Sequence, residues 1–259
     1  MVLSSEIFLL IANNWLIILL FFLISLLYAS VGFGGGSSYL AILTLTAMTF
    51  PQIRATALLC NIVVVAGNVY RYQKLGTYTW KKVIPLVAFS VPFAFLGGFL
   101  KISQTFFFIL LGLTLLFAAM SMWFSKKISG LPEQINRFNG SKNAAFGVAI
   151  GFISGMVGIG GGIFLAPLLY CTKWDLPKKI AATASLFILL NSISGLFGQY
   201  LNPDFAVNWR VTSVLLITVC IGGQLGNSLS LRLISPIQLK KATAILIAFV
   251  SLRILSRYL

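Results

Sequence analysis

The sequence contains no histidine, few carboxylates and few cysteines. Its four acidic residues lie outside or at the edges of apolar segments: Glu6, Glu133, Asp175 and Asp204. Its three cysteines, Cys60, Cys171 and Cys220, form no C-x-x-C pair and read as small buried residues. Histidine, carboxylates and thiolates supply most metal ligands, catalytic acids and bases, and intramembrane proton relays. We therefore expect no enzyme active site, no metal and no cofactor.

Charge is also scarce, which excludes an ordinary soluble domain. Only 9 % of the 259 residues are charged and 59 % are hydrophobic, whereas a soluble domain is about 25 % charged. The chain therefore has too little polar surface to cover a globule in water, and we expect an all-α polytopic membrane protein. No Lys or Arg precedes Arg54, so the first apolar stretch lacks the basic region of a signal peptide and reads as a retained span.

The charge that is present is almost all positive, with a net charge of +15 from 19 Lys and Arg. Basic cytoplasmic loops beside anionic lipid account for such an excess. Attraction of an anionic substrate would leave the same mark, and the sequence does not separate the two effects. No basic run forms a separate soluble module, so a nucleic-acid partner is not expected.

Ten apolar segments follow one another along the chain, with short loops between them. The longest polar stretch, near the middle, reads as a linker, which predicts an N-terminal half (1–125), a linker (126–142) and a C-terminal half (143–259). The segments are 15–32, 37–50, 55–70, 82–100, 105–124, 143–157, 163–172, 180–200, 210–230 and 238–256.

The two halves are repeats of one another. Residues 31–36 (Val-Gly-Phe-Gly-Gly-Gly) align with 157–162 (Val-Gly-Ile-Gly-Gly-Gly), and the register holds to Pro51 and Pro177. With one residue of shift, the Ala-Thr-Ala steps at 55–57 and 182–184 also align. Such ordered self-similarity predicts an internal duplication.

The distribution of basic residues predicts how the repeats lie in the membrane. With five spans in each half, 5 of the 19 Lys and Arg fall on the side of the termini and 14 on the other. The positive-inside rule then places both termini outside a plasma (inner) membrane. An odd number of spans gives the halves opposite orientations, so we predict two inverted repeats of about five transmembrane segments, as in many transporters.

The glycine runs predict breaks inside the membrane. Segments 37–50 and 143–157 would reach only about 21–22 Å as helices, against a hydrocarbon core of about 30 Å. A helix that starts within the membrane has unpaired N–H groups and a partial positive charge, and glycine lets a ligand approach them closely. Such a start can bind an anion without a charged side chain. Close helix packing through small residues is the alternative interpretation.

Polar side chains within the apolar segments are further candidates. Amides and hydroxyls can hydrogen-bond an oxyanion, although they also serve as interhelical hydrogen bonds. Arg54, at the start of the third segment, can pair with an anion or anchor a loop. The candidate substrate-binding residues are Gly34, Gly35, Gly36, Ser37, Ser38, Gly160, Gly161, Gly162, Asn61, Asn191, Thr56, Thr183 and Arg54.

The glycine runs, the proline and Ala-Thr-Ala steps and the duplicated halves resemble the sulfite exporter TauE/SafE (TSUP) family over about residues 15–256. This resemblance implies a bacterial-type plasma-membrane carrier of sulfite, sulfonates or related sulfur-containing organic anions. One departure is Ser37-Ser38 in the first half against Ile163-Phe164 in the second, so the half-sites are chemically unequal.

Three functions fit these observations. The leading hypothesis is a secondary transporter of small anions that works by alternating access, with binding at the two glycine-rich helix breaks. An anion channel of the same fold and a non-transporting membrane scaffold are the alternatives. The expected partners are a small anionic substrate and anionic lipids at the cytoplasmic face, and the oligomeric state is left open, a homo-oligomer included.

Overall fold

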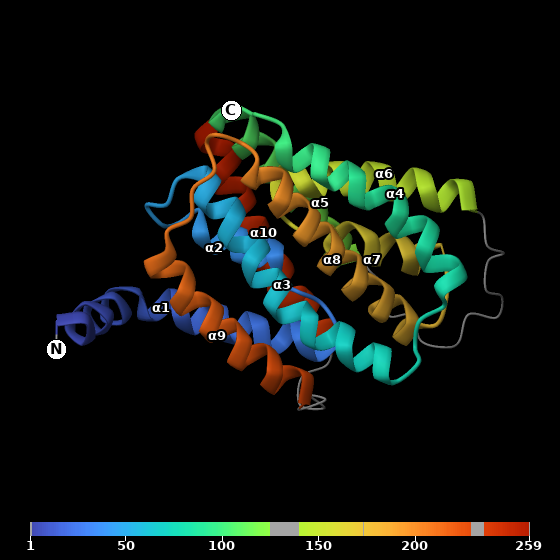
Figure 1. Ribbon diagram of the computed structural model, residues 1–259, viewed down its shortest axis with the longest axis horizontal. Helices are drawn as coiled ribbons and strands as arrows, with labels where there is room; N and C mark the ends of the chain where they lie inside the picture. The colour runs from blue at the N-terminus through green and yellow to red at the C-terminus, as the bar shows by residue number, and fades with distance from the viewer. Residues whose placement is uncertain (1, 125–139, 173, 229–235, 259) are drawn as a thin grey trace.

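The computed structural model describes residues 2–124, 140–172, 174–228 and 236–258 (Figure 1). Over these residues the chain forms ten helices and no strand, so the predicted all-α fold is confirmed. Most of the predicted linker lies outside the described residues. The helices are α1 (Val2–Val31), α2 (Gly36–Leu43), α3 (Phe50–Lys74), α4 (Trp80–Phe99), α5 (Gln104–Phe124), α6 (Gly140–Val157), α7 (Gly162–Cys171), α8 (Pro177–Tyr200), α9 (Trp209–Ser228) and α10 (Pro236–Tyr258).

Four of these helices are long and apolar enough to cross a membrane: α3, α4, α8 and α9. Shorter apolar stretches occur in α1, α5 and α6, over Trp15–Val31, Gln104–Phe117 and Ala144–Val157. By contrast, α2 and α7 have only 8 and 10 residues, or about 12 and 15 Å of helix. The glycine runs therefore do precede very short helices.

The ends of the helices follow from local chemistry. Thr49 and Gln52 form a capping box that begins α3, with the Thr49 N–H donating to Gln52 Oε1 at 3.1 Å. The predicted segment 37–50 is helical only as far as Leu43, because residues 44–49 form turns. In these turns the hydroxyls of Thr44 and Thr46 donate to the carbonyls of Ala41 and Leu43.

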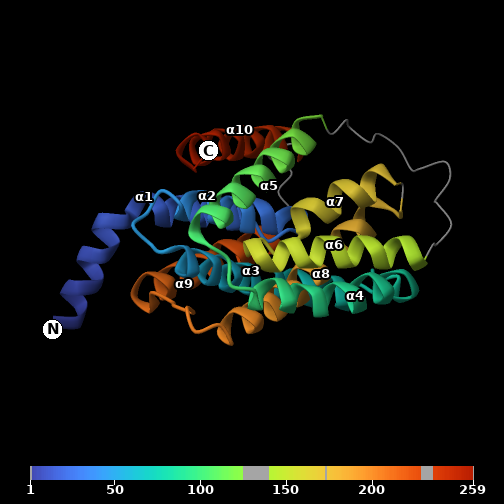
Figure 2. The same ribbon diagram turned by 90° about the horizontal axis from the view of Figure 1, so that it is seen from above.

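Helices from the two halves interlock (Figures 1 and 2). Helix α4 of the first half packs mainly on α6 and α8 of the second, and α9 of the second half packs on α1 and α3 of the first. Helix α3 also packs directly on α8, and α5 on α10. These pairings match one another under the sequence repeat, since α4 corresponds to α9 and α6 to α1.

Glycine allows these helices to approach closely. A Cβ at Gly155 of α6 would collide with the carbonyl oxygen of Ala94 in α4, and a Cβ at Gly226 of α9 would collide with that of Leu26 in α1. Close backbone contact through small residues is how helices associate in a membrane, where lipid removes the usual hydrophobic driving force.

The short helix α2 is enclosed by α1, α3 and α10. All eight of its residues are buried. The ring of Tyr39 stacks on Phe21 of α1 with centroids 4.7 Å apart. An eight-residue helix is marginal on its own, so surrounding protein holds the start of α2 in place.

Candidate functional site at the two helix breaks

The first glycine run turns the chain from α1 into α2. Gly32 and Gly35 have φ of 90° and 85°, a left-handed conformation that favours glycine. The N–H groups of Ser38 and Tyr39 both donate to the carbonyl of Gly35, at 2.9 and 3.0 Å. The N–H groups of Gly36 and Ser37 then head the helix without an intrahelical partner.

The second glycine run repeats this geometry between α6 and α7. Gly158, Gly160 and Gly161 have φ of 83°, 79° and 81°. The N–H groups of Phe164 and Leu165 donate to the carbonyl of Gly161 at 3.2 and 3.1 Å. Two glycine-broken helix starts of similar construction therefore exist in the fold, as predicted from the sequence. They differ at Gly160, which has a left-handed φ, whereas its counterpart Gly34 does not.

The two runs meet at Asn61, which is the twelfth of the 25 residues of α3. Its Nδ2 donates to the carbonyl of Ile159 in the second run at 2.8 Å. A Cβ added at Gly34 in the first run would lie 2.5 Å from its Oδ1, and one added at Gly160 would lie 3.0 Å from its Nδ2. A single fully buried amide therefore fills the space between both runs.

The position equivalent to Asn61 in the second half is occupied by Ile188. Its side chain faces Gly162 and Gly160, as the Asn61 amide faces Gly36 and Gly34. Ser192 corresponds in the same way to Val65, and a Cβ at Gly160 would lie 2.6 Å from Ser192 Oγ. The two half-sites are thus unequal, which agrees with the inequality already visible at residues 37–38 and 163–164.

The runs approach Asn61 from opposite ends of α3. Gly32 lies against the ring of Tyr72, in the last turn of α3, and its carbonyl accepts a hydrogen bond from Ser185 of α8. Gly158 instead lies against Arg54 near the start of α3, where an added Cβ would be 3.3 Å from the Arg54 Cα.

The two serines after the first run are buried in the first turn of α2. The hydroxyl of Ser38 lies 3.2 Å from that of Tyr28. Hydroxyls at this point add side-chain donors beside the free backbone N–H groups. The second run has apolar residues there.

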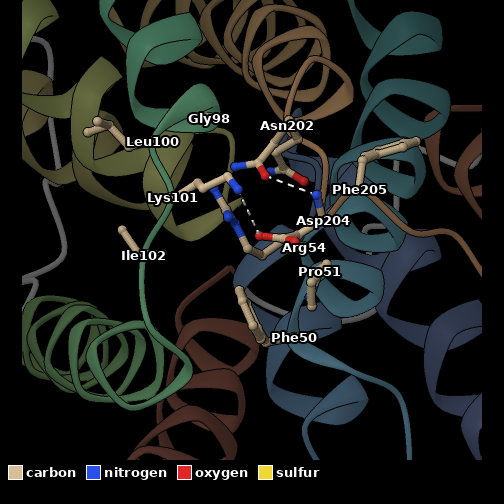
Figure 3. A pocket seen from close by; sticks show the side chains of 11 residues that line it. Phe50, Pro51, Arg54, Gly98, Leu100, Lys101, Ile102, Asn202, Asp204 and Phe205 are labelled. Atoms are coloured by element: carbon tan, nitrogen blue, oxygen red, sulfur yellow. Dashed lines mark hydrogen bonds and ion pairs between the residues drawn. The ribbon is translucent and has the colours of Figure 1, made fainter.

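Arg54 is brought next to the second glycine run. Arg54 is only 4 % exposed. Its Nη2 donates to the carbonyl of Gly155 at 3.2 Å, and its guanidinium carbon lies 5.9 Å from the centre of the Phe107 ring. Nε has no hydrogen-bond partner within the described part of the chain. Arg54 also lines a recess between the start of α3 and the ends of α4 and α8 (Figure 3).

The other predicted residues lie away from the glycine runs. Thr56 bonds Thr212 of α9 at 2.9 Å, and Thr183 donates to the carbonyl of Lys179 in its own helix. Asn191 donates to Ser90 of α4 at 3.0 Å. Thr56 and Asn191 therefore tie helices together, whereas the Thr183 hydroxyl bonds only within α8.

Two residues at or near the site were not among the predicted ones. Ser192 faces Gly160 and its hydroxyl has no partner among the described residues. Gln199 lines the recess beside Arg54. Extending the repeat alignment by its 127-residue offset would have paired Asn61 with Ile188 and Val65 with Ser192 and so drawn attention to Ser192.

A separate charged cluster fixes the loop between α7 and α8. Asp175 pairs with Lys82 of α4 at 3.1 Å and with Lys179 at 3.8 Å, and it accepts the N–H of Leu176. Burial raises the pKa of this carboxyl, but the Leu176 N–H and the two ammonium groups outweigh burial and leave the pKa below its usual 3.8. Within the described residues, no three His, Cys, Asp or Glu gather as a metal site would require.

The profile of the Sulfite exporter TauE/SafE family matches residues 17–254, which span both glycine runs and nearly the whole chain. The chain belongs to the TauE/SafE family. No solved structure matches it.

Other TauE/SafE-like proteins carry names that agree. The chain is 32 % identical to the probable membrane transporter protein y4hK of Sinorhizobium fredii, over 91 % of this chain and 95 % of that protein. It is 28 % identical to the probable membrane transporter protein MJ0441 of Methanocaldococcus jannaschii, over 87 % and 89 %, and 27 % identical to YunE of Bacillus subtilis, over 78 % and 83 %. The family and these relatives identify the chain as a membrane transporter.

Proposed function

We propose that this protein is a secondary transporter of small anions, with sulfite, sulfonates or related sulfur-containing organic anions as substrates. One observation carries the proposal: two glycine-broken helix starts meet at the amide of Asn61, halfway along α3. The name of the family supports the substrate class.

The proposed binding chemistry is that of backbone N–H groups and helix dipoles. The N–H groups at Gly36 and Ser37, and at Gly162 and Ile163, point outward from the starts of α2 and α7, where the helix carries a partial positive charge. These groups stabilise an anion without the desolvation cost of a buried ammonium. The Asn61 amide and the Ser37 and Ser38 hydroxyls add side-chain donors on one side.

The arrangement favours a carrier over a channel. The Asn61 side chain lies in the space between the runs, and an occluded site of this kind is what a carrier requires. Gly32 and Gly158 reach it from opposite ends of α3, which supports inverted repeats. Rocking one set of helices against the other would expose the site to one face at a time.

The lack of histidine, together with the position of the carboxylates at the edges of the apolar segments, bears on how transport is driven. The chain has no His, and its four Asp and Glu lie outside or at the edges of the apolar segments. A cell interior negative by 100 mV favours the exit of each negative charge by about 2.3 kcal/mol. We therefore propose that export driven by the membrane potential runs without a titratable coupling residue.

The basic loops support a proposed orientation of the protein in the membrane. The side that carries 14 of the 19 Lys and Arg faces the cytoplasm and its anionic lipids in our proposal, with both termini outside a plasma (inner) membrane.

Transport of sulfite and sulfoacetate into proteoliposomes tests the proposal. We expect uptake that saturates with concentration and is accelerated by the same anion preloaded inside, which is the behaviour of a carrier. Uptake that does not saturate and ignores the preloaded anion would indicate the channel. No uptake of either anion by folded protein, beside a working control transporter, would remove sulfur anions as the substrates.

A further inference from the structure

A recess opens at the end of the molecule where α3 begins and α4 and α8 end. We name it the α3 recess. The space inside it that the centre of a water molecule can occupy is about 20 Å³. Its polar lining residues are Arg54, Lys101, Gln199, Asn202 and Asp204. Figure 3 labels all of these except Gln199 and shows them around one space, with apolar side chains nearby.

The positive charge of Arg54 has no counter-ion in the described structure. The ion pairs there join other residues, and the one hydrogen bond from its guanidinium goes to a neutral carbonyl, that of Gly155. Arginine stays protonated in proteins, and a buried charge without a partner is strongly destabilising. The recess is the open space into which a compensating negative charge can enter.

A second buried donor lines the same wall. Gln199, in the last turn of α8, is 4 % exposed, and its Nε2 has no hydrogen-bond partner among the described residues. Arg54 Nε is unpartnered as well. Two residues with unpartnered N–H donors therefore line one recess, and small rotations of their side chains would turn these donors toward the oxygens of a bound oxyanion, where charge-assisted N–H···O bonds are strong.

The remaining polar groups do not neutralise Arg54. Asp204 lies 3.8 Å from Lys101 and both are more than 60 % exposed at the mouth. The Asn202 amide is used locally: its Oδ1 accepts the Asp204 N–H and its Nδ2 donates to the carbonyl of Phe99. The mouth is therefore close to neutral, and the positive charge lies deep in the recess.

We propose that the α3 recess is a binding site for a small oxyanion, held by Arg54 and Gln199. This site is separate from the place where the two glycine runs meet at Asn61, which we name the glycine junction. The recess adjoins the second glycine run, since Arg54 contacts both the Gly155 carbonyl and Gly158. In the proposed orientation an anion bound there lies between the junction and the outer face, and in this respect the proposal rests on the proposed transport function. A free oxyanion and the phosphate of a lipid headgroup present the same oxygens to these donors.

Binding of sodium sulfite and sodium sulfate to the purified full-length protein tests this site. The protein is placed in phosphatidylcholine nanodiscs at constant ionic strength, and the dissociation constant is measured by calorimetry. We expect Gln199→Leu to weaken binding about tenfold, since one hydrogen bond to a charged ligand is lost. Arg210→Gln removes an exposed positive charge on α9 outside the recess and should bind as the wild type does.

Gln199→Glu provides the sharpest variant, because it supplies a tethered carboxylate to the recess wall. We expect this variant to lose the part of anion binding that belongs to the recess and, without added oxyanion, to unfold at a higher temperature than the wild type. Wild-type affinity in both Gln199→Leu and Gln199→Glu, or no oxyanion binding by the wild type, would overturn the site. Neither result depends on Arg54 variants, which disrupt the bond to Gly155.

A second set of nanodiscs, made with phosphatidylglycerol, distinguishes a free anion from a lipid headgroup phosphate as the ligand. Sulfite affinity that is equal in phosphatidylcholine and phosphatidylglycerol discs supports a site for free anions. Affinity that falls with phosphatidylglycerol, and does so only when Gln199 is intact, supports occupancy by the headgroup phosphate of the same site.

Failure of this site and failure of the transport proposal are distinguishable. Gln199-dependent binding without flux of any tested anion would leave the recess standing and remove the transport proposal. Saturable flux with oxyanion binding that ignores both Gln199 substitutions would do the reverse.

Discussion

Asn61 is the residue on which the glycine junction depends. Its amide contacts both runs, and its Nδ2 donates to the carbonyl of Ile159 in the other half of the sequence. We expect Asn61→Ala to reduce sulfite flux at least about tenfold, the effect of losing one hydrogen bond to a charged ligand. The loss of stability should be only about 1 kcal/mol, as for other polar contacts in membranes. Initial flux rates per folded protein measure the first, and thermal unfolding in detergent the second.

Asn191→Ala is the matched control for this change. Asn191 is also a buried asparagine in a central helix, but it bonds Ser90 and the carbonyl of Phe187 rather than the glycine runs. A similar loss of flux in Asn191→Ala and Asn61→Ala would argue that general helix packing, not the junction, governs transport.

Asp175 gives a prediction about pH. Its pKa is depressed in the folded protein, so its contribution to stability is fully present above the unfolded pKa of about 3.9 and is lost as the pH falls through the lower folded pKa. At pH 7, Asp175→Asn should lower the free energy of unfolding by about 1–3 kcal/mol, because Lys82 loses its charged partner. Unfolding temperatures of wild type and variant should converge as the pH drops below about 4.

Asp204→Asn serves for comparison, because Asp204 and Lys101 are exposed and their pairing is worth little. An Asp175→Asn effect no larger than that of Asp204→Asn at pH 7 would contradict this account of the loop between α7 and α8.

At the scale of elements, the contact of α6 with α4 depends on backbone approach. Gly155→Ala would drive a methyl group into the Ala94 carbonyl and should cost about 1–3 kcal/mol, as overpacking does. Gly223→Ala in α9 meets its nearest atoms, on Val64, at 3.6 Å. It should be neutral or should stabilise by up to about 1 kcal/mol through helix propensity. Unfolding temperatures in detergent separate the two, and equal temperatures would show that the two helix contacts tolerate a methyl group alike.

The helices could be predicted well from the sequence, because an apolar segment in lipid has to pair its own backbone N–H and C=O groups, which a helix does. The exception is 37–50, where Thr44 and Thr46 are apolar enough to extend a run but turn the chain through their own hydroxyl bonds. Hydropathy does not distinguish a threonine in a helix from one in such a turn.

The site was harder to predict than the fold. The glycine runs could be recognised because they occur twice, at matched positions of the two halves. Asn61 and Asn191, by contrast, have similar sequence surroundings and differ in the groups that they contact in the fold. The partner of Asn61 is a backbone carbonyl 98 residues away. The unpartnered state of Arg54 and Gln199 also depends on distant neighbours and has no sequence signature.

For the whole molecule, the halves of the sequence are not separate bodies in space. Helices α4 and α9 each pack on the other half, so separate halves would expose backbone surfaces built for close contact. A sequence divided at its polar linker gives no sign of this exchange, because both halves have the same kind of apolar helices.

The proposed orientation also belongs to this scale. In a cysteine-free background, Lys101→Cys should react with a membrane-impermeant maleimide on intact cells, while Lys81→Cys should react only after permeabilisation. Both positions are exposed in the structure, so their difference reports the side of the membrane. Labelling of Lys81→Cys alone on intact cells would reverse the predicted topology.

The most direct test of the central claim is sulfite flux from proteoliposomes under an imposed membrane potential. We predict saturable flux that increases when the potential, negative on the sulfite side, favours anion exit. We also predict that flux falls sharply in Gly35→Val and Gly161→Val, whose left-handed φ values and close neighbours leave no room for a side chain. Gly76→Ala, at a left-handed glycine in open space, should retain wild-type flux. Flux that ignores the potential, or that persists in folded Gly35→Val and Gly161→Val proteins, would contradict anion transport at the meeting of the glycine runs.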